Sequence, residues 1–299
     1  MDYNNLLWNK IEQSVKEKGE NNLLDYAQKE YKELVENKLC EDFYTASEIV
    51  DFMRANDIPF SCRGRLPALV TSYLLNFITF NPLTFGLKAE YFFDSLMFIN
   101  FDISQKRKGE MEDFLYQTFD NKVSKLALQD DKGKFFTHAC NYLFVEDVYN
   151  KYPPIKINGE NCVFVSSLKW LDKQENGFII ALLKMDVLDK IKEHEIKNGV
   201  SEKDYGLYDN EEVFERIRNK NNDYAYFSHY QRDKFNEQKE NSIKALAYAL
   251  MLEKEYVDDK YLSHFICYAR LIYKQACFFK EVYHTILSSE SCVFLQSKK

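Results

Sequence analysis

The chain of 299 residues contains only 9 glycines and 5 prolines. So few residues of these two types leave little room for the tight turns of an all-β protein, so the sequence favours a helix-rich fold. There is no Cys-x-x-Cys pair, and the 7 cysteines are scattered along the chain. This spacing indicates neither a zinc site nor a disulfide framework, and it fits a reducing, intracellular setting.

Long apolar runs are also missing. No run of about 18 apolar residues occurs that could span a membrane, and the first residues, MDYNNLLWNKIEQ, lack the apolar core of a signal peptide. We therefore expect a cytoplasmic protein. The formal net charge of -7 argues against a generally basic, nucleic-acid-binding surface, although it leaves room for a local basic cleft.

The residues that are abundant predict a globular protein with a sizeable core. Hydrophobic residues make up 45% of the chain, which includes 24 Phe and 21 Tyr. Thr45-Ala46-Ser47-Glu48 has the pattern of a capping box that starts a helix. Apolar spacing predicts helices over residues 3–18, 21–37, 66–78, 84–94, 105–118, 135–149, 188–197, 213–217, 241–255 and 258–287, and strands over 96–103, 121–128, 162–167 and 178–187.

The most specific pattern lies between Ser61 and Lys108. In order along the chain it contains Arg63-Gly64, Tyr73-Leu74-Leu75, Asn81-Pro82-Leu83, Gly86-Leu87, Glu90 and Phe92. This order resembles the palm of the bacterial replicative DNA polymerase III alpha subunit, a family C polymerase. Shorter matches continue in the same order at 120–125, 183–188 and 261–290, so the resemblance covers residues 30–290.

The resemblance implies an α/β (α+β) fold, with a polymerase-beta-like nucleotidyltransferase palm, a mixed sheet, surrounding helices and a reduced fingers region. We expect a palm-like domain with N-terminal helices over residues 1–200 and a helical remnant of the fingers over 201–299, with one single domain as the alternative. Such a polymerase uses two Mg²⁺ ions held by carboxylates from neighbouring strands, and residues two apart in a strand face the same side.

The metal site implied by the resemblance is largely replaced. In register, its two metal-binding aspartates fall on Phe98 and Asn100, and a carboxylate is kept only at Asp102 and, from a second strand, at Asp186. A slip of the alignment by one strand repeat would move Asp102 into a metal position and would still leave only these two acids. Asp186 and Asp102 are therefore the predicted catalytic remnants, and Asp186 is the candidate metal ligand.

Phosphate-binding features are partly kept. Pro67-Ala68 stands where the family has Gly-Ser, and proline lacks the N–H that could approach a phosphate. Basic side chains contact phosphates without reading sequence. The alternative is that the arginine holds a turn and that residues 106–108 are a solvated helix face. The candidate residues for binding a nucleotide or DNA are Arg63, Gly64, Lys184 and Arg107.

Three further groups are weaker candidates. His138-Ala139-Cys140 could be a nucleophile pair, but no third residue orients it, so a core histidine on a helix is the simpler interpretation. His264 fits a packed or hydrogen-bonded role on a long helix. The aromatic cluster over residues 224–230 could stack on single-stranded bases, and a half-buried strand is the alternative.

Three functions stay open from the sequence. The first is a catalytically degenerate polymerase III alpha-like protein that binds a replication or phage-type protein partner, or DNA, and needs no cofactor. The second is a minimal nucleotidyltransferase that uses Asp102 and Asp186 with Mg²⁺. The third is a structural assembly protein without nucleic acid. None of the three involves a membrane, and the acidic balance favours a protein partner over DNA.

Overall fold

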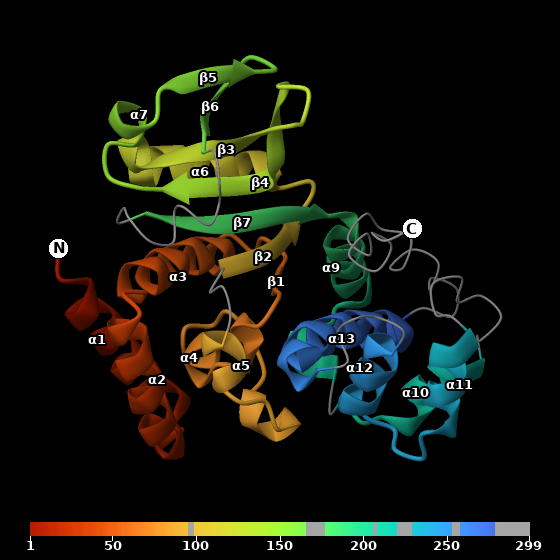
Figure 1. The fold of residues 1–299 in the computed structure, drawn as a ribbon. Coiled ribbons are helices and arrows are strands. Elements are labelled where there is room, and N and C mark those ends of the chain that lie inside the picture. Colours follow the sequence, from red (N-terminus) through yellow and green to blue (C-terminus); the bar gives the residue numbers. More distant parts are fainter. Residues whose placement is uncertain (95–98, 166–176, 206–207, 220–228, 253–257, 279–299) are drawn as a thin grey trace.

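The computed structural model describes residues 1–299 except for 95–98, 166–176, 206–207, 220–228, 253–257 and 279–299. The described residues form a seven-stranded mixed sheet with helices around it (Figure 1), which confirms the predicted α/β (α+β) class. The strand order is β1-β2-β7-β4-β3-β6-β5. The strands are β1 (Phe60–Cys62), β2 (Ile99–Ser104), β3 (Val123–Gln129), β4 (Phe135–Phe144), β5 (Pro154–Ile157), β6 (Glu160–Phe164) and β7 (Phe178–Met185).

Strand β2 has one apolar and one polar face. It pairs in parallel with β7 and antiparallel with the short edge strand β1. Because side chains alternate along a strand, the apolar residues at 99, 101 and 103 lie on one face and the polar residues at 100, 102 and 104 on the other. The ring of Phe101 contacts those of Phe60 and Phe77, whereas Asp102 and Ser104 meet polar partners. The polar face of β2 therefore points toward the candidate site.

The N-terminal helices confirm the predicted periodicity. They are α1 (Tyr3–Lys18) and α2 (Leu24–Glu36), joined by the turn η1 (Asn21–Leu23), followed by α3 (Cys40–Ala55). The predicted capping box was wrong, because α3 begins at Cys40 and Thr45 lies inside it. The hydroxyl of Ser47 instead donates to the carbonyl of Tyr44 and accepts from Lys10 at 2.7 Å, so this polar residue ties α3 to α1.

The helical segments after β1 are shorter than predicted. They are η2 (Leu66–Ala68), α4 (Val70–Leu74), η3 (Pro82–Phe85) and α5 (Glu90–Phe93). Two left-handed residues explain the breaks: Asn76 at φ 59 follows α4, and Gly86 at φ 64 follows η3. Glycine and asparagine tolerate this conformation and commonly end helices in it. Proline at the first or second position of η2 and η3 favours the start of each turn.

The predicted helix over 135–149 was wrong, because most of this segment is strand β4. β4 lies between β7 and β3 and pairs with both. Tyr142, Leu143 and Phe144 are all buried, so this part of the strand lacks the alternation that distinguishes a strand from a helix. Only the short helix α7 (Val148–Lys151) is helical there.

The remaining predicted helices are confirmed in the described residues, with bounds shifted by a few positions. A further helix, α11 (His229–Glu237), and strand β5 were not predicted. The short turns η4 (Asp120–Lys122), η5 (Glu202–Tyr205) and η6 (Asp259–Tyr261) connect elements. The confirmed helices are α6 (Lys108–Phe119), α9 (Asp186–Asn198), α10 (Glu211–Asn219), α12 (Ile243–Met251) and α13 (Leu262–Phe278).

One cluster of buried apolar side chains joins the N-terminal helices, the sheet and the C-terminal helices. It includes Leu7 of α1, Phe101 of β2 and Tyr273 of α13. A second, smaller cluster lies under α7 and includes Leu126, Val148 and Val163. The first cluster contains residues from both sides of position 200, and the predicted domain boundary there stays a prediction. No helix in the described part of the chain is long and apolar enough to cross a membrane.

Candidate functional site

The polar face of β2 carries a buried ion pair. The side chains of Arg63 and Asp102 are only 5% and 3% exposed, and Nε of the arginine lies 3.4 Å from Oδ1 of the aspartate. Burial raises the pKa of Asp102 to about 6, against the opposing effect of the guanidinium. Burial also acts to lower the pKa of Arg63, but Asp102 and Tyr268 outweigh it and the pKa is raised. At neutral pH the two groups therefore form a charged pair.

The Arg63-Gly64 turn is held by helix α13. Gly64 has φ +71, a conformation that side chains other than glycine rarely adopt. Its N–H donates to Nδ1 of His264 at 3.0 Å, and its carbonyl accepts from the hydroxyl of Ser263 at 3.0 Å. The guanidinium of Arg63 donates to the hydroxyl of Tyr268. Arg63 and Gly64, two of the four residues predicted to bind a nucleotide or DNA, thus contact other residues of the chain.

The histidine in this contact is neutral. Burial lowers the pKa of His264 to about 3, and the charge of Arg63 acts in the same direction. A neutral imidazole can accept at one ring nitrogen, as Nδ1 does from Gly64. This geometry fits the predicted hydrogen-bonded role of His264 on a long helix.

The two acids predicted as catalytic remnants are not brought together. In the β2–β7 register Asp102 is paired with Leu183, and Asp186 follows three residues later. Strand β7 ends at Met185 and Asp186 is the first residue of α9, so Asp186 lies beyond the end of the strand. Its side chain is 41% exposed and pairs with Lys190 at 2.8 Å. In the described residues no three His, Cys, Asp or Glu side chains form a cluster that could hold a metal ion.

The structure describes only one of the two positions, 98 and 100, at which the family has metal-binding aspartates. Asn100 pairs with Ala181, five residues before Asp186, and its side-chain amide lies near Gly64. Phe98 lies outside the described residues. Asp186, at the start of α9, is therefore farther along the chain from the partner of position 100 than from the partner of Asp102.

The other two predicted phosphate contacts lie on the surface. Lys184 is exposed near the end of β7. Arg107 pairs with Glu110 and donates to the carbonyl of Asn56 at 3.3 Å. These two residues are accessible, whereas Arg63 is buried, so the four predicted residues do not form one basic surface.

An acid of the chain takes the backbone donors at the start of α4. The N–H groups of Val70 and Thr71 donate to the carboxylate of Glu30 at 2.9 and 2.7 Å. Burial raises the pKa of Glu30 to about 7, although these hydrogen bonds act to lower it. The segment follows Pro67-Ala68, which replaces the family's Gly-Ser. Glu30 was not predicted from the sequence. Its place on the buried face of α2, between Ala27 and Leu34, could have indicated an acid with a partner inside the fold.

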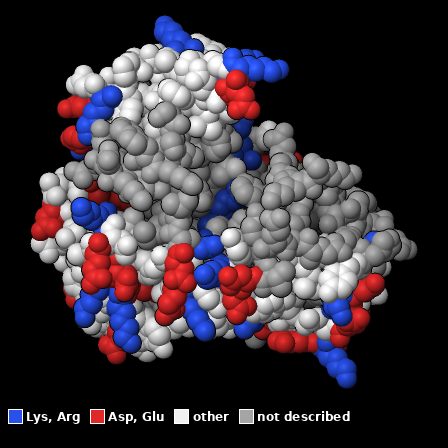
Figure 2. Space-filling view, in the orientation of Figure 1, with Lys and Arg blue, Asp and Glu red and all other residues white. Residues whose placement is uncertain are grey.

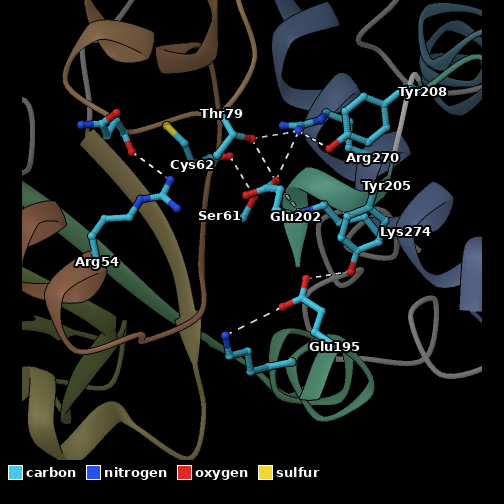
Figure 3. Close-up of polar contacts among 12 residues, drawn as sticks. Arg54, Ser61, Cys62, Thr79, Glu195, Glu202, Tyr205, Tyr208, Arg270 and Lys274 are labelled. Carbon is cyan, nitrogen blue, oxygen red and sulfur yellow. Dashed lines mark hydrogen bonds and ion pairs between the residues drawn. The ribbon is translucent and has the colours of Figure 1, made fainter. Parts of the chain in front are cut away.

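A pocket of about 270 Å³ lies beside the ion pair. It is lined by residues of β1, α3, α9, α13 and η5, and Cys62 and Cys267 stand between it and Arg63. Figure 3 shows its charged residues, which include Arg54, Glu202 and Arg270. In the view of Figure 2, Lys and Arg side chains lie in a hollow near the middle of the molecule. Sequence analysis did not identify this pocket, although Arg270 and Lys274, four residues apart on an apolar helix, could have drawn attention to it.

A comparison with known families gives one match. Residues 2–130 match the family model described as Bacterial DNA polymerase III alpha NTPase domain. The first part of this chain is therefore similar to the NTPase domain of the bacterial DNA polymerase III alpha subunit. The match confirms the resemblance predicted from the sequence, and it covers less than half of the 299 residues. A comparison with curated proteins gives no match. The matched residues include Arg63 and Asp102 and end before β7 and Asp186.

The weaker candidates lie mostly outside the residues that the structure describes. His138 to Cys140 belong to strand β4 and not to the predicted helix, and their side chains are outside the described part of the chain. Most of the aromatic cluster also lies outside it, because residues 220–228 are not described. Tyr230, at the start of α11, is 47% exposed.

Proposed function

We propose that this protein is a catalytically degenerate relative of the polymerase III alpha subunit, which does not join nucleotides and acts by binding a protein partner of the replication or phage type. The observation that carries the proposal is the state of the remaining acids. Asp102 is buried against Arg63, whereas Asp186 lies beyond the end of β7 and pairs with Lys190.

Two-metal catalysis makes a demand that these residues do not meet. The two ions lie about 4 Å apart and need carboxylates that converge on both. The amide of Asn100 offers one neutral oxygen, and a cation next to Asp102 would be repelled by the guanidinium of Arg63. The two surviving acids each have a basic partner of their own. This arrangement supports a protein that has kept the polymerase fold and lost the chemistry.

The charge distribution favours a protein partner over DNA. A surface that follows a nucleic-acid backbone needs cations that are free to replace counterions at phosphates. Many basic residues in the described part of the chain are instead paired with acids of the chain, and the net charge is -7. These pairs include Lys106–Glu193, Arg107–Glu110, Lys108–Glu112, Lys125–Glu160, Lys190–Asp186 and Lys192–Asp57.

The decisive experiment for the chemistry is extension of a primed DNA template with Mg²⁺ or Mn²⁺. We expect no product from the wild-type chain, even at an enzyme concentration equal to that of the primer. Extension by the wild type that disappears in Asp186→Ala would contradict the proposal and establish the minimal-polymerase alternative. Asp102→Asn serves as the second variant, because it tests whether the buried acid takes part.

The nature of the ligand needs a separate measurement. Fluorescence anisotropy with a labelled primed duplex should show no binding at moderate salt. Binding that weakens steeply with salt and survives Asp186→Ala would make DNA the ligand. A protein partner from the native host should form a stoichiometric complex with the purified chain after nuclease treatment. A complex that is lost on nuclease treatment would count against the protein-partner assignment.

A further inference from the structure

The pocket beside β1 combines an apolar wall with a charged end. The wall includes Ile58, Phe77, Ile78, Leu188, Ile191 and Leu271. The charged end contains Arg54, Glu202, Arg270 and Lys274. Binding sites for small molecules typically combine a mostly apolar lining with a few convergent polar groups.

At the charged end, three cations face one acid. The carboxylate of Glu202 accepts from Nζ of Lys274 at 2.6 Å, from the hydroxyl of Thr79 at 2.9 Å and from the guanidinium of Arg270 at 3.4 Å (Figure 3). Burial favours the neutral acid, but Lys274 and Arg270 outweigh it and lower the pKa of Glu202 to about 2. The acid is therefore ionised, and it neutralises only one of the three cations.

The third cation increases the imbalance. Burial lowers the pKa of Arg54, the charge of Glu202 raises it, and the charge of Arg270 lowers it again. Arg54 lines the same pocket, and the charges of Glu202 and Arg270 both act on its pKa. Its own hydrogen bond goes to the carbonyl of Asn76 at 3.1 Å, and no acid is paired with it among the described ion pairs. The Glu202 end of the pocket thus carries two positive charges in excess.

Arg270 is held in place for binding. It is 8% exposed, and its guanidinium lies over the rings of Phe80 and Tyr208, at 4.3 and 4.5 Å from their centroids. Its terminal nitrogen donates to Thr79 at 2.9 Å, while its buried Nε has no hydrogen-bond partner among the described residues. A guanidinium that is fixed in this way is suited to bind an oxyanion.

The other charges of the pocket form a separate group with more acids than cations. Lys192 pairs with Asp57 at 2.7 Å and lies 4.0 Å from Glu195, which also accepts from the hydroxyl of Tyr205 at 2.7 Å. This second group holds one cation and two acids. The positive excess is therefore confined to the Glu202 end.

We propose that this pocket binds a small organic phosphate monoester. The phosphate would lie among Arg54, Arg270 and Lys274, and the organic part would lie along the apolar wall. A phosphate dianion matches the two excess charges better than a carboxylate monoanion does, and the volume of about 270 Å³ limits the ligand to a small molecule. Glu202 occupies part of the anion site and weakens binding. This inference does not depend on the absence of nucleotide transfer.

The test measures binding of phenyl phosphate to the full chain by isothermal titration calorimetry. Inorganic phosphate, benzoate and phenol are the comparison ligands. We expect one site for phenyl phosphate, weaker binding of inorganic phosphate and benzoate, and no competition by phenol. Glu202→Gln should tighten binding about tenfold and Lys274→Gln should weaken it about tenfold, which corresponds to about 1.4 kcal/mol in each case. Lys16→Gln makes the same change on an exposed part of α1 and should leave the affinity unaltered.

Three results would overturn the proposal. They are the absence of saturable phenyl phosphate binding to the wild type, equal binding of phenol or inorganic phosphate, and a shift of the two pocket variants in the same direction. Circular dichroism checks that each variant is folded. If Lys274→Gln is unfolded, Lys274→Arg keeps the charge and should retain binding, and its failure to do so would also count against the site.

Discussion

The Arg63–Asp102 pair and the Glu202 cluster both contain buried charges, but they differ in balance and in access. In the first, one acid meets one base, both almost fully buried and covered by α13. In the second, three cations and one acid line the same end of a pocket. A buried ion pair without net charge has no capacity to bind a further ion. A cluster that lines a pocket and carries a net positive charge has this capacity. Under the two proposals above, the polymerase-like centre is structural and the capacity to bind an anion lies in the pocket.

The largest effect should come from breaking the closed pair. Asp102→Ala leaves the guanidinium of Arg63 buried without its acid, and such changes cost about 3–5 kcal/mol. Equilibrium unfolding in urea, followed by circular dichroism at neutral pH, measures the loss. The double variant Arg63→Met, Asp102→Leu removes both charges and should regain most of the stability. A loss below about 1 kcal/mol for Asp102→Ala would show that the pair is not the closed unit described above.

A second large effect concerns pH and Glu30. The pKa of Glu30 is raised from 4.5 to about 7, so the folded state binds more protons than the unfolded state between these values. Stability should therefore fall as the pH rises through this window, by about 3 kcal/mol for this group. Glu30→Gln keeps a carbonyl acceptor and should remove this part of the slope. Urea unfolding at several pH values compares the two proteins, and identical slopes would contradict the assignment.

The pocket acid should respond to pH in the opposite direction. The pKa of Glu202 is lowered from 4.5 to about 2, so its contribution to stability is present above pH 4.5 and is lost as the pH falls toward 2. Glu202→Gln should cost about 1–2 kcal/mol at neutral pH, since two cations lose a charged hydrogen-bond acceptor. The variant should be less sensitive to acid than the wild type. Thermal unfolding across this range tests both points.

The smallest effects should come from the exposed basic residues. Arg107→Ala and Lys184→Ala should each change the free energy of unfolding by less than about 0.5 kcal/mol, because exposed side chains contribute little. Neither variant should alter phenyl phosphate binding, because neither residue lines the pocket. A clear loss in either measurement would place a functional surface outside the pocket.

Much of the fold could be predicted from sequence because its pattern is local. The spacing of Leu7, Ile11 and Val15 gives the buried face of α1, and the apolar runs give β2 and β7. Strand β4 could not be predicted in this way. Tyr142 and Phe144 pack in one apolar cluster and Leu143 packs in the other, and no local signal reports that both faces of a strand are covered.

The candidate site was predictable only in part. Motif order identified Asp102, Asp186 and the Arg63-Gly64 turn, because these residues belong to a pattern that is continuous in the sequence. Spacing could not show that Asp102 is closed off by Arg63, since that contact depends on how β1 and α13 pack. The Glu202 cluster was missed for the same reason, because its members come from segments far apart in the chain.

The pairing of β2 with β7 determines which residues would face acids placed at positions 98 and 100. Acids reintroduced at positions 98 and 100 would face a neighbouring strand that offers only Ala181 opposite position 100, with Asp186 five residues beyond. Sliding one strand by five residues would not help, because an odd shift turns every side chain to the opposite face. Under the proposed function, acids restored at positions 98 and 100 alone should therefore not give DNA synthesis, because Asp186 lies beyond the end of β7.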